Sequence, residues 1–379
     1  MMMLAPSISP ATQYGSVNIV RSGVTHVFDN GRTDTYSKTM SLRRMRPVAR
    51  STLVSISQKN SIRPTIVFNR SSMDSPISHR TLSAYLVSPS DLSTALQSPC
   101  PPIPLCASWF LPNDSQRRTG RAVFAASRIP GARFFDIDAV KDNSSPYPHM
   151  LPSSATFAAA MGSLGITRED TVVVYDTKEL GIFSAPRVAW TLSRMGHQNV
   201  HVLNNYRLWV EAGLPTTSGE PGEPETVRYE DADVQEPAHV VDYECVRNLV
   251  TGAPTPGLEG ALVLDARPRG RFDGTEPEPR PGLPSGHMPG AVSVPFGDVL
   301  DPESRAFLPR ERLRELFEAR GVKPGVPLVS SCGTGVTAVV LDAALAEAGY
   351  ETQARFVYDG SWTEWAMRSK DVEGLIEKS

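Results

Sequence analysis

The stretch "LVSSCGTGVTAVVLDAALAEAG", residues 328–349, decides the expected fold. Its first four residues form a short run that is typical of a buried parallel strand. Cys332 follows directly, with Gly333 and Gly335 beside it. The remaining residues have the apolar spacing of a helix that ends at Gly349. This order of elements predicts an α/β unit with a cysteine at the carboxyl end of a strand.

The same alternation of strands and helices extends over much of the chain. Short apolar runs predict strands at 171–177, 199–204, 261–267, 291–296, 326–331 and 354–360. Helical spacing predicts helices at 185–196, 311–321 and 337–349. Strands that alternate with helices in this way favour a mainly parallel sheet flanked by helices.

Two halves of the chain echo each other. The matching segments are 128–138 with 287–298, 171–190 with 326–341, and 206–215 with 360–369. A repeat of such a long period indicates two similar domains. We predict an N-terminal domain over 80–217, a linker rich in Gly, Pro and Glu over 218–236, and a C-terminal domain over 237–372.

The composition excludes several classes of protein. The chain has 379 residues, a net charge of −3 and 40% hydrophobic residues, so it is expected to be globular and not to bind nucleic acid. It contains no apolar run of the length that spans a membrane. The four cysteines form no CxxC pair and no metal-ligand spacing with histidine, so we expect free thiols and no metal.

The first 80 residues are unlike the rest. They hold eleven Lys and Arg residues against three Asp, and they are rich in Ser and Thr. This pattern is typical of an organelle transit peptide, so we expect a leader over 1–75 and a mitochondrial protein. Two alternatives stay open: a disordered leader without a targeting role, or a true start at Met40 or Met73 and a cytoplasmic protein.

The loop after Cys332 is suited to an anion. Gly333 and Gly335 are expected to let the backbone turn with positive φ, so that its N–H groups face one point. The helix that follows adds its positive N-terminal end. These groups are expected to lower the pKa of a thiol and to stabilise a persulfide anion on the same sulfur.

This loop has three alternative interpretations. A buried cysteine can simply pack as a small apolar residue. Gly333, Gly335 and Ala338 match a GxGxxA dinucleotide fingerprint with Asp359 as its acid, but too few residues follow Asp359 to complete that fold. A cysteine phosphatase would close the loop with an arginine, where this chain has Thr337 and Ala338.

Seven motifs carry a family resemblance. They are "ASWFLP" (107–112), "IPGARFFDID" (129–138), "SSPYPHMLP" (144–152), "FSAPRVAW" (183–190), "GRFDGTEPEPRPGLPSGHMPGAVSVPF" (270–296), "CGTGVTA" (332–338) and "YDGSWTEW" (358–365). On these motifs residues 83–368 resemble the two-domain rhodanese sulfurtransferases, and among them the members that use 3-mercaptopyruvate. The resemblance implies two tandem rhodanese-like α/β domains, of which the second is catalytic. The first is expected to be silent because Asp176 stands where Cys332 stands in the second.

The resemblance also implies the site residues. Cys332 is expected to be the nucleophile, and Arg271 and Arg280 to bind the carboxylate and keto oxygen of the donor. A guanidinium fork suits such a planar anion, although pairing with Glu276 and Glu278 is an alternative role for both arginines. The other loop residues expected at the substrate are Gly333, Gly335, Val336 and Thr337.

A proton relay is implied as well. Asp138 and His149 of the first domain are expected to face the loop and to join Thr334, which replaces the usual serine of the family. A His–Asp pair is a suitable general acid and base. The alternative for His149 is a purely structural role. His287, Arg187 and Cys106 are expected to be structural: in a turn, at the domain interface and in the core.

The expected function is transfer of sulfane sulfur from 3-mercaptopyruvate, with release of pyruvate, through a Cys332 persulfide to a thiol or to cyanide. No metal or organic cofactor is expected, thioredoxin or glutathione is the expected kind of acceptor, and the chain is expected to be a monomer. Three alternatives remain: thiosulfate as the donor, a carrier that relays persulfide to a protein partner, and a non-catalytic scaffold. The intact Cys332, Arg271 and Arg280 argue against the scaffold.

Overall fold

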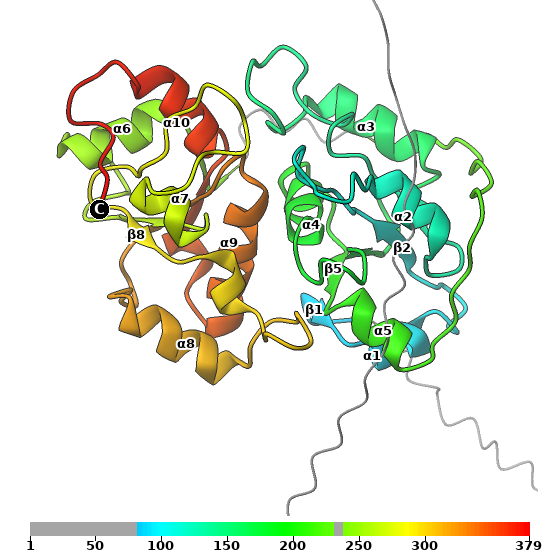
Figure 1. Ribbon diagram of the computed structural model, residues 1–379. Helices are drawn as coiled ribbons and strands as arrows, with labels where there is room; N and C mark the ends of the chain where they lie inside the picture. The colour runs from blue at the N-terminus through cyan, green and yellow to red at the C-terminus, as the bar shows by residue number, and fades with distance from the viewer. Residues whose placement is uncertain (1–81, 231–237) are drawn as a thin grey trace, which may run out of the picture. The chain divides into compact units, whose positions relative to one another are not determined.

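The computed structural model describes residues 82–230 and 238–379, which form two parallel sheets flanked by helices (Figure 1). The expected leader over 1–75 lies outside the described residues, as does part of the expected linker. The two-domain α/β prediction is confirmed, whereas the domain boundaries given above stay predictions. No described helix has the length and apolar character needed to cross a membrane.

The first sheet has five parallel strands. They are β1 (Leu86–Val87), β2 (Ile103–Cys106), β3 (Arg133–Phe134), β4 (Val172–Tyr175) and β5 (Val200–Leu203), in the spatial order β1-β5-β4-β2-β3. Its helices are α1 (Pro89–Ala95), α2 (Gly120–Ala126), α3 (Ser154–Ser163), α4 (Ala185–Arg194) and α5 (Tyr206–Glu211). Apolar residues of α1, α2 and α5 pack in the cluster on one face, and those of α3 and α4 in the cluster on the other. Such two-sided cover explains why all four residues of β4 are buried.

The second sheet repeats this arrangement. Its strands are β6 (Val240–Val241), β7 (Leu262–Asp265), β8 (Val292–Ser293), β9 (Leu328–Ser331) and β10 (Arg355–Tyr358), in the order β6-β10-β9-β7-β8. Its helices are α6 (Tyr243–Thr251), α7 (Arg269–Asp273), α8 (Arg310–Ala319), α9 (Val336–Ala348) and α10 (Ser361–Ser369), with short 3-10 turns η1 (Phe296–Val299) and η2 (Thr352–Ala354). Figure 1 shows α6 and α10 across the sheet from α8 and α9. Matched in chain order, the two sheets have the same strand order.

Helix α9 lies at the centre of the largest apolar cluster. Valine, alanine and leucine cover most of its circumference, and it packs against both α8 and α4. A helix that is apolar on all sides must be covered on all sides. The apolar core therefore runs without interruption from the second sheet through α9 and α4 to the first.

One expected strand is much shorter than predicted. The run at 291–296 forms a strand only over Val292–Ser293, and η1 begins at Phe296. Pro295 precedes that turn with a φ of −49°, and it has no N–H to continue a ladder. The apolar pattern therefore marked the buried segment correctly, but not the point where the strand ends.

Candidate active site

Cys332 follows directly on β9, the middle strand of the second sheet, and its side chain lines a cavity of about 520 Å³. The residue is only 2% exposed. Its backbone N–H donates to Ser361 Oγ over 3.1 Å, and its carbonyl accepts from the Trp362 N–H over 2.9 Å. Both partners lie at the start of α10, so this helix holds the cysteine backbone in place.

Of the two loop glycines, Gly335 has the expected positive φ, whereas Gly333 lies outside the left-handed region. Gly335 adopts a left-handed φ of +75° and forms the N-cap of α9. Within residues 82–230 and 238–379, the backbone N–H groups of Gly333, Thr334 and Gly335 have no hydrogen-bond acceptor. Free N–H groups at a helix N-terminus are available to an anion.

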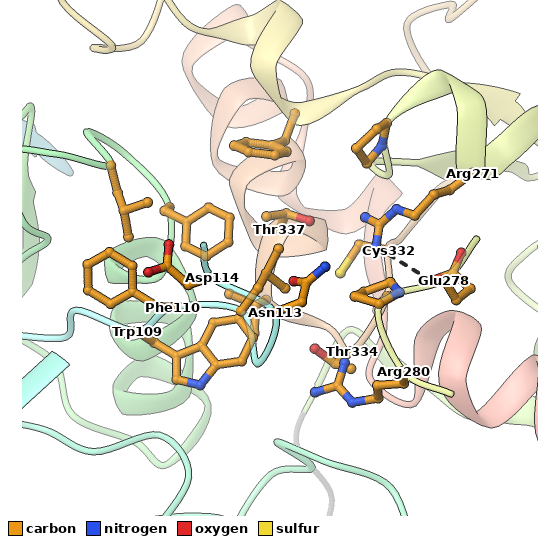
Figure 2. A pocket seen from close by; sticks show the side chains of 18 of the residues that line it. Trp109, Phe110, Asn113, Asp114, Arg271, Glu278, Arg280, Cys332, Thr334 and Thr337 are labelled. Atoms are coloured by element: carbon orange, nitrogen blue, oxygen red, sulfur yellow. Dashed lines mark hydrogen bonds and ion pairs between the residues drawn. The ribbon is translucent and has the colours of Figure 1, made fainter. Parts of the chain in front are cut away.

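The cavity has two chemically different ends. Figure 2 shows Cys332, Arg271 and Glu278 at one end, and Trp109, Phe110 and Asp114 at the other. The remaining lining residues are Leu111, Asn113, Glu179, Leu180, Phe183, Pro268, Pro279, Arg280, Phe296, Arg305, Gly333, Thr334, Val336 and Thr337. Every loop residue predicted at the substrate thus lines the cavity except Gly335. A Cβ atom at Gly335 would instead meet the backbone of Asp359 and the side chain of Arg187.

The two predicted arginines differ in their partners. Arg271, on α7, lies 3.5 Å from a carboxylate oxygen of Glu278, so the alternative of ion pairing holds in part for this residue. Arg280 has no carboxylate within ion-pair distance in the described part of the chain. Burial lowers the pKa of Arg280, although Asp138 and Cys332 act in the opposite direction. A half-buried cation without an ion-pair partner is a good binding group for an anionic substrate.

Asp138, His149 and Thr334 form one chain of hydrogen bonds. Thr334 Oγ1 lies 3.0 Å from His149 Nδ1, and Asp138 Oδ1 lies 2.9 Å from His149 Nε2. Trp109 Nε1–H donates to the other oxygen of Asp138 over 2.8 Å. With the ring proton on Nε2, Nδ1 accepts from the Thr334 hydroxyl, which is the arrangement a proton relay needs. The predicted juxtaposition of these three residues is therefore present.

The surroundings of His149 favour its neutral form. The residue is 3% exposed, and this burial is the main cause that lowers the pKa of the imidazole. Asp138 raises the same pKa, whereas the positive charges of Arg187 and Arg280 lower it. The hydrogen bond from His149 in turn lowers the pKa of Asp138. A neutral imidazole beside an ionised carboxylate has the protonation state that a general base needs.

The residues expected to be structural lie as predicted. Cys106 is buried, and burial raises its pKa to about 12. His287 Nδ1 lies 2.9 Å from the carbonyl oxygen of Phe272, and its ring stacks on the ring of that residue. Arg187 of α4 contacts residues of both domains.

Several residues of the site were not predicted from the sequence. Trp109 holds Asp138, Ser361 holds the backbone of Cys332, and Asp359 pairs with Arg187. The available signal was that Trp109 lies in the motif 107–112 and that Asp359 and Ser361 lie in the motif 358–365. Their partners, however, are distant in the sequence.

Comparison with known proteins agrees with this geometry. Residues 254–368 match the model of the rhodanese-like domain. The probable 3-mercaptopyruvate sulfurtransferase of Schizosaccharomyces pombe is 40% identical over 274 residues, which cover 72% of this chain and 89% of the relative. The thiosulfate sulfurtransferase TUM1 of Saccharomyces cerevisiae is 40% identical over 279 residues, which cover 70% of this chain and 89% of the relative.

A solved structure extends the likeness to both domains. The sulfur transferase subunit of yeast mitochondrial complex I matches with a TM-score of 0.69 at 35% identity, over 78% of this chain and 100% of that one. With Cys332 at the carboxyl end of the middle strand and two arginines beside it, the chain belongs to the two-domain rhodanese sulfurtransferases.

Proposed function

We propose that this sulfurtransferase takes sulfur from 3-mercaptopyruvate and carries it as a persulfide on Cys332. The observation that carries the proposal is the shared cavity, in which Cys332, Arg271, Arg280 and Thr334 all expose side-chain atoms. A small keto acid with a thiol presents an anion for the arginines and a sulfur for the cysteine at the same time.

The first half-reaction begins with binding of the donor. Arg271 and Arg280 bind its carboxylate and keto oxygen, which points the donor sulfur toward Cys332. The Cys332 thiolate attacks that sulfur, and the carbon–sulfur bond breaks. The bonding electron pair passes to the carbon and forms the enolate of pyruvate.

The relay returns a proton to the product. The thiol proton of the donor passes through Thr334 and His149, whose ring is held by Asp138, and ends on the enolate carbon to give pyruvate. Cys332 keeps the outer sulfur as a persulfide anion. The free N–H groups of Gly333, Thr334 and Gly335 stabilise this anion as an oxyanion hole stabilises oxygen.

The second half-reaction regenerates the enzyme. A thiol acceptor attacks the outer sulfur, the sulfur–sulfur bond to Cys332 breaks, and the cysteine leaves as thiolate. Glutathione and the dithiol of thioredoxin are acceptors of the required chemistry, and cyanide is a simple substitute. Neither half-reaction calls for a metal or an organic cofactor.

Thiosulfate is the second candidate donor, because TUM1, at 40% identity, is named for it. The loop from Gly333 to Thr337 contains no cationic side chain that would balance a dianion. Comparison of kcat/KM for the two donors tests the choice. A larger value for mercaptopyruvate supports the proposal, and a larger value for thiosulfate reverses it.

Relay to a protein partner is a further role of the same chemistry. The similarity to the sulfur transferase subunit of a mitochondrial complex supports a mitochondrial location and a protein partner beside the small-molecule reaction. Import of the full chain into isolated mitochondria, with loss of a segment near residue 75, tests the location. Native mass measurement tests whether the chain is a monomer.

The central experiment detects the persulfide. The purified chain is treated with 3-mercaptopyruvate and digested, and the peptide that contains Cys332 is weighed. One added sulfur atom on this peptide, and none in the Cys332→Ser variant, is the expected result. An active enzyme whose Cys332 peptide stays unmodified would overturn the mechanism.

A further inference from the structure

A buried ion pair joins the two domains directly behind the active-site loop. Arg187, in the first turn of α4, lies with its Nη1 atom 2.6 Å from Asp359 Oδ1, one residue beyond β10. The two side chains are only 3% and 5% exposed. The guanidinium carbon of Arg187 also lies over the ring of Trp190, 4.6 Å from its centre, in a cation–π contact. Neither charged residue lines the cavity.

The side chains of Arg187 and Asp359 also form hydrogen bonds with the backbone of His149 and Leu151. Arg187 Nη2 donates to the His149 carbonyl, and Asp359 Oδ2 accepts from the Leu151 N–H over 2.8 Å. Arg187 Nη1 also donates to the carbonyl of Gly335 over 3.3 Å. The guanidinium of Arg187 thus contacts both Gly335, the residue after Thr334, and His149, whose ring bonds to the Thr334 hydroxyl. Its fork of donors is what allows both contacts at once.

The backbone of His149 needs such support. Its φ of +63° lies in the left-handed region, which is unfavourable for a residue with a side chain. A conformation of this kind persists when the surrounding contacts determine it. Here the contacts are the hydrogen bond from Arg187 to the His149 carbonyl and the hydrogen bond from the Leu151 N–H, two residues later, to Asp359.

We propose that Arg187 and Asp359 are positioning residues, which hold His149 Nδ1 on the Thr334 hydroxyl while Asp138 holds Nε2. The proposal rests on the proposed function insofar as the relay is used in catalysis. Arg187 and Asp359 touch neither the donor nor the sulfur. They act through the placement of the imidazole and of the loop.

The charges of Arg187 and Asp359 also affect the pKa of His149. The groups that face His149 are Asp138, Arg187, Arg280, Thr334 and the edge of the Trp109 ring. The positive charge of Arg187 lowers the pKa of His149. Removal of this charge therefore raises the pKa of His149. Removal of the Asp359 charge leaves Arg187 uncompensated and lowers the pKa of His149 further.

The two shifts in the pKa of His149 move the pH dependence of kcat/KM in opposite directions. Because the relay needs a neutral imidazole, kcat/KM falls as the pH falls through the pKa of His149. Arg187→Gln is expected to move this acid limb to higher pH, and Asp359→Asn to lower pH. Arg187→Lys keeps the positive charge, so the acid limb of the pH profile should stay in place. Lysine cannot keep the contacts to Asp359, Gly335 and His149 at once, so kcat should fall.

The test compares these variants in the full chain with 3-mercaptopyruvate. Arg187→Lys is expected to lower kcat roughly 10- to 100-fold with little change in KM, as misplacement of a reacting group does. The matched control is Arg355→Lys, which alters another shielded ion pair, with Asp342 at 2.7 Å, that contacts neither His149 nor Gly335. The control is expected to keep kcat and the acid limb. An equal loss in both variants would overturn the proposal.

A double variant separates this proposal from the relay itself. If Arg187 acts through His149, Arg187→Lys should lower kcat little further in the His149→Gln variant. The same fall in kcat with and without His149 would refute the positioning role. If His149→Gln alone keeps full activity, the relay of the proposed function fails instead. In that case ¹⁵N shifts of the His149 ring, measured in the Asp359→Asn variant, still report whether the pair holds the ring: unchanged shifts refute it, and changed shifts support it.

Discussion

Asp176 occupies in the first sheet the position that Cys332 occupies in the second. Each residue follows directly on the middle strand of its sheet, β4 or β9, and precedes a loop that leads to a buried helix. The Asp176 carboxylate accepts from the N–H groups of Phe183, Ser184 and Ala185 and from the Ser184 hydroxyl. The first domain thus fills its own anion site with a side chain. The corresponding loop of the second domain keeps its N–H groups free.

This difference predicts a single sulfur-carrying residue in the chain. Burial raises the pKa of Cys106 to about 12, and its thiol lies at the end of β2 inside the core. A protonated, shielded thiol does not attack a sulfur donor or an alkylating reagent. After treatment with 3-mercaptopyruvate, mass spectrometry should therefore find added sulfur on the Cys332 peptide alone.

Alkylation of the native chain supplies the control for that experiment. Iodoacetamide should modify the exposed Cys100 readily and should reach Cys106 only after unfolding. A sulfur atom or a rapid label on Cys106 in the native protein would mean that the first domain also takes part.

The sequence predicted some parts of this structure better than others, for physical reasons. Strand β4 and helix α9 are buried on all sides. Such elements consist of consecutive apolar residues, which can be recognised in the sequence. The end of β8 was misplaced, because an apolar run does not show where Pro295 stops the ladder. Local pattern therefore predicted the elements well and their ends less well.

The contacts within the site could not be predicted from local sequence patterns. His149 and Thr334 are 185 residues apart, and Arg187 and Asp359 are 172 apart. Periodicity carries no information on such pairs, so the expected relay came from family resemblance. The ion pair behind the loop was not expected at all, because its role lies in backbone contacts that no motif records.

The Thr334 hydroxyl should matter more than the extra methyl group of threonine. Thr334→Ser keeps the group that bonds to His149 Nδ1, so its kcat should stay within a few-fold of the parent. Thr334→Val keeps the shape but removes the hydroxyl, and kcat should fall by about 100-fold, the lower range for loss of a proton-transfer group. Steady-state kinetics on mercaptopyruvate measure both. Equal rates for the valine and serine variants would exclude the hydroxyl from the relay.

Arg280 should contribute more to binding of the donor than its neighbours do. Glu278 already compensates part of the charge of Arg271, whereas Arg280 has no such partner among the described residues. Loss of charge-assisted hydrogen bonds of about 1.5–3 kcal/mol corresponds to a fall of about 10- to 150-fold in kcat/KM for Arg280→Met. Initial rates over a range of donor concentrations give this number.

The control for Arg280 is Arg269, an exposed arginine outside the cavity. Arg269 lies on α7 with Arg271, but it is exposed, pairs with Asp273 and does not line the cavity. Arg269→Met should leave kcat/KM within about two-fold, since exposed ion pairs contribute little. A loss as large as that of Arg280→Met would point to a general effect of positive charge instead of a specific contact.

Gly335 should tolerate no side chain, in contrast to Gly333 two residues earlier. At Gly335 a Cβ atom would lie 2.7 Å from the carbonyl oxygen of Asp359 and 2.8 Å from Arg187 Nη1, and the backbone has a φ of +75°. At Gly333 no atom lies within 4 Å of the same position. Gly335→Ala should lower the free energy of unfolding by about 2 kcal/mol through backbone strain alone. It should also lower kcat, because the added methyl group displaces the pair that holds His149. Urea unfolding and steady-state rates measure the two effects, and Gly333→Ala, which should unfold like the parent, is the matched control for stability. Equal unfolding midpoints for the two alanine variants would show that the loop adjusts freely and that its tight contact with Asp359 is not needed.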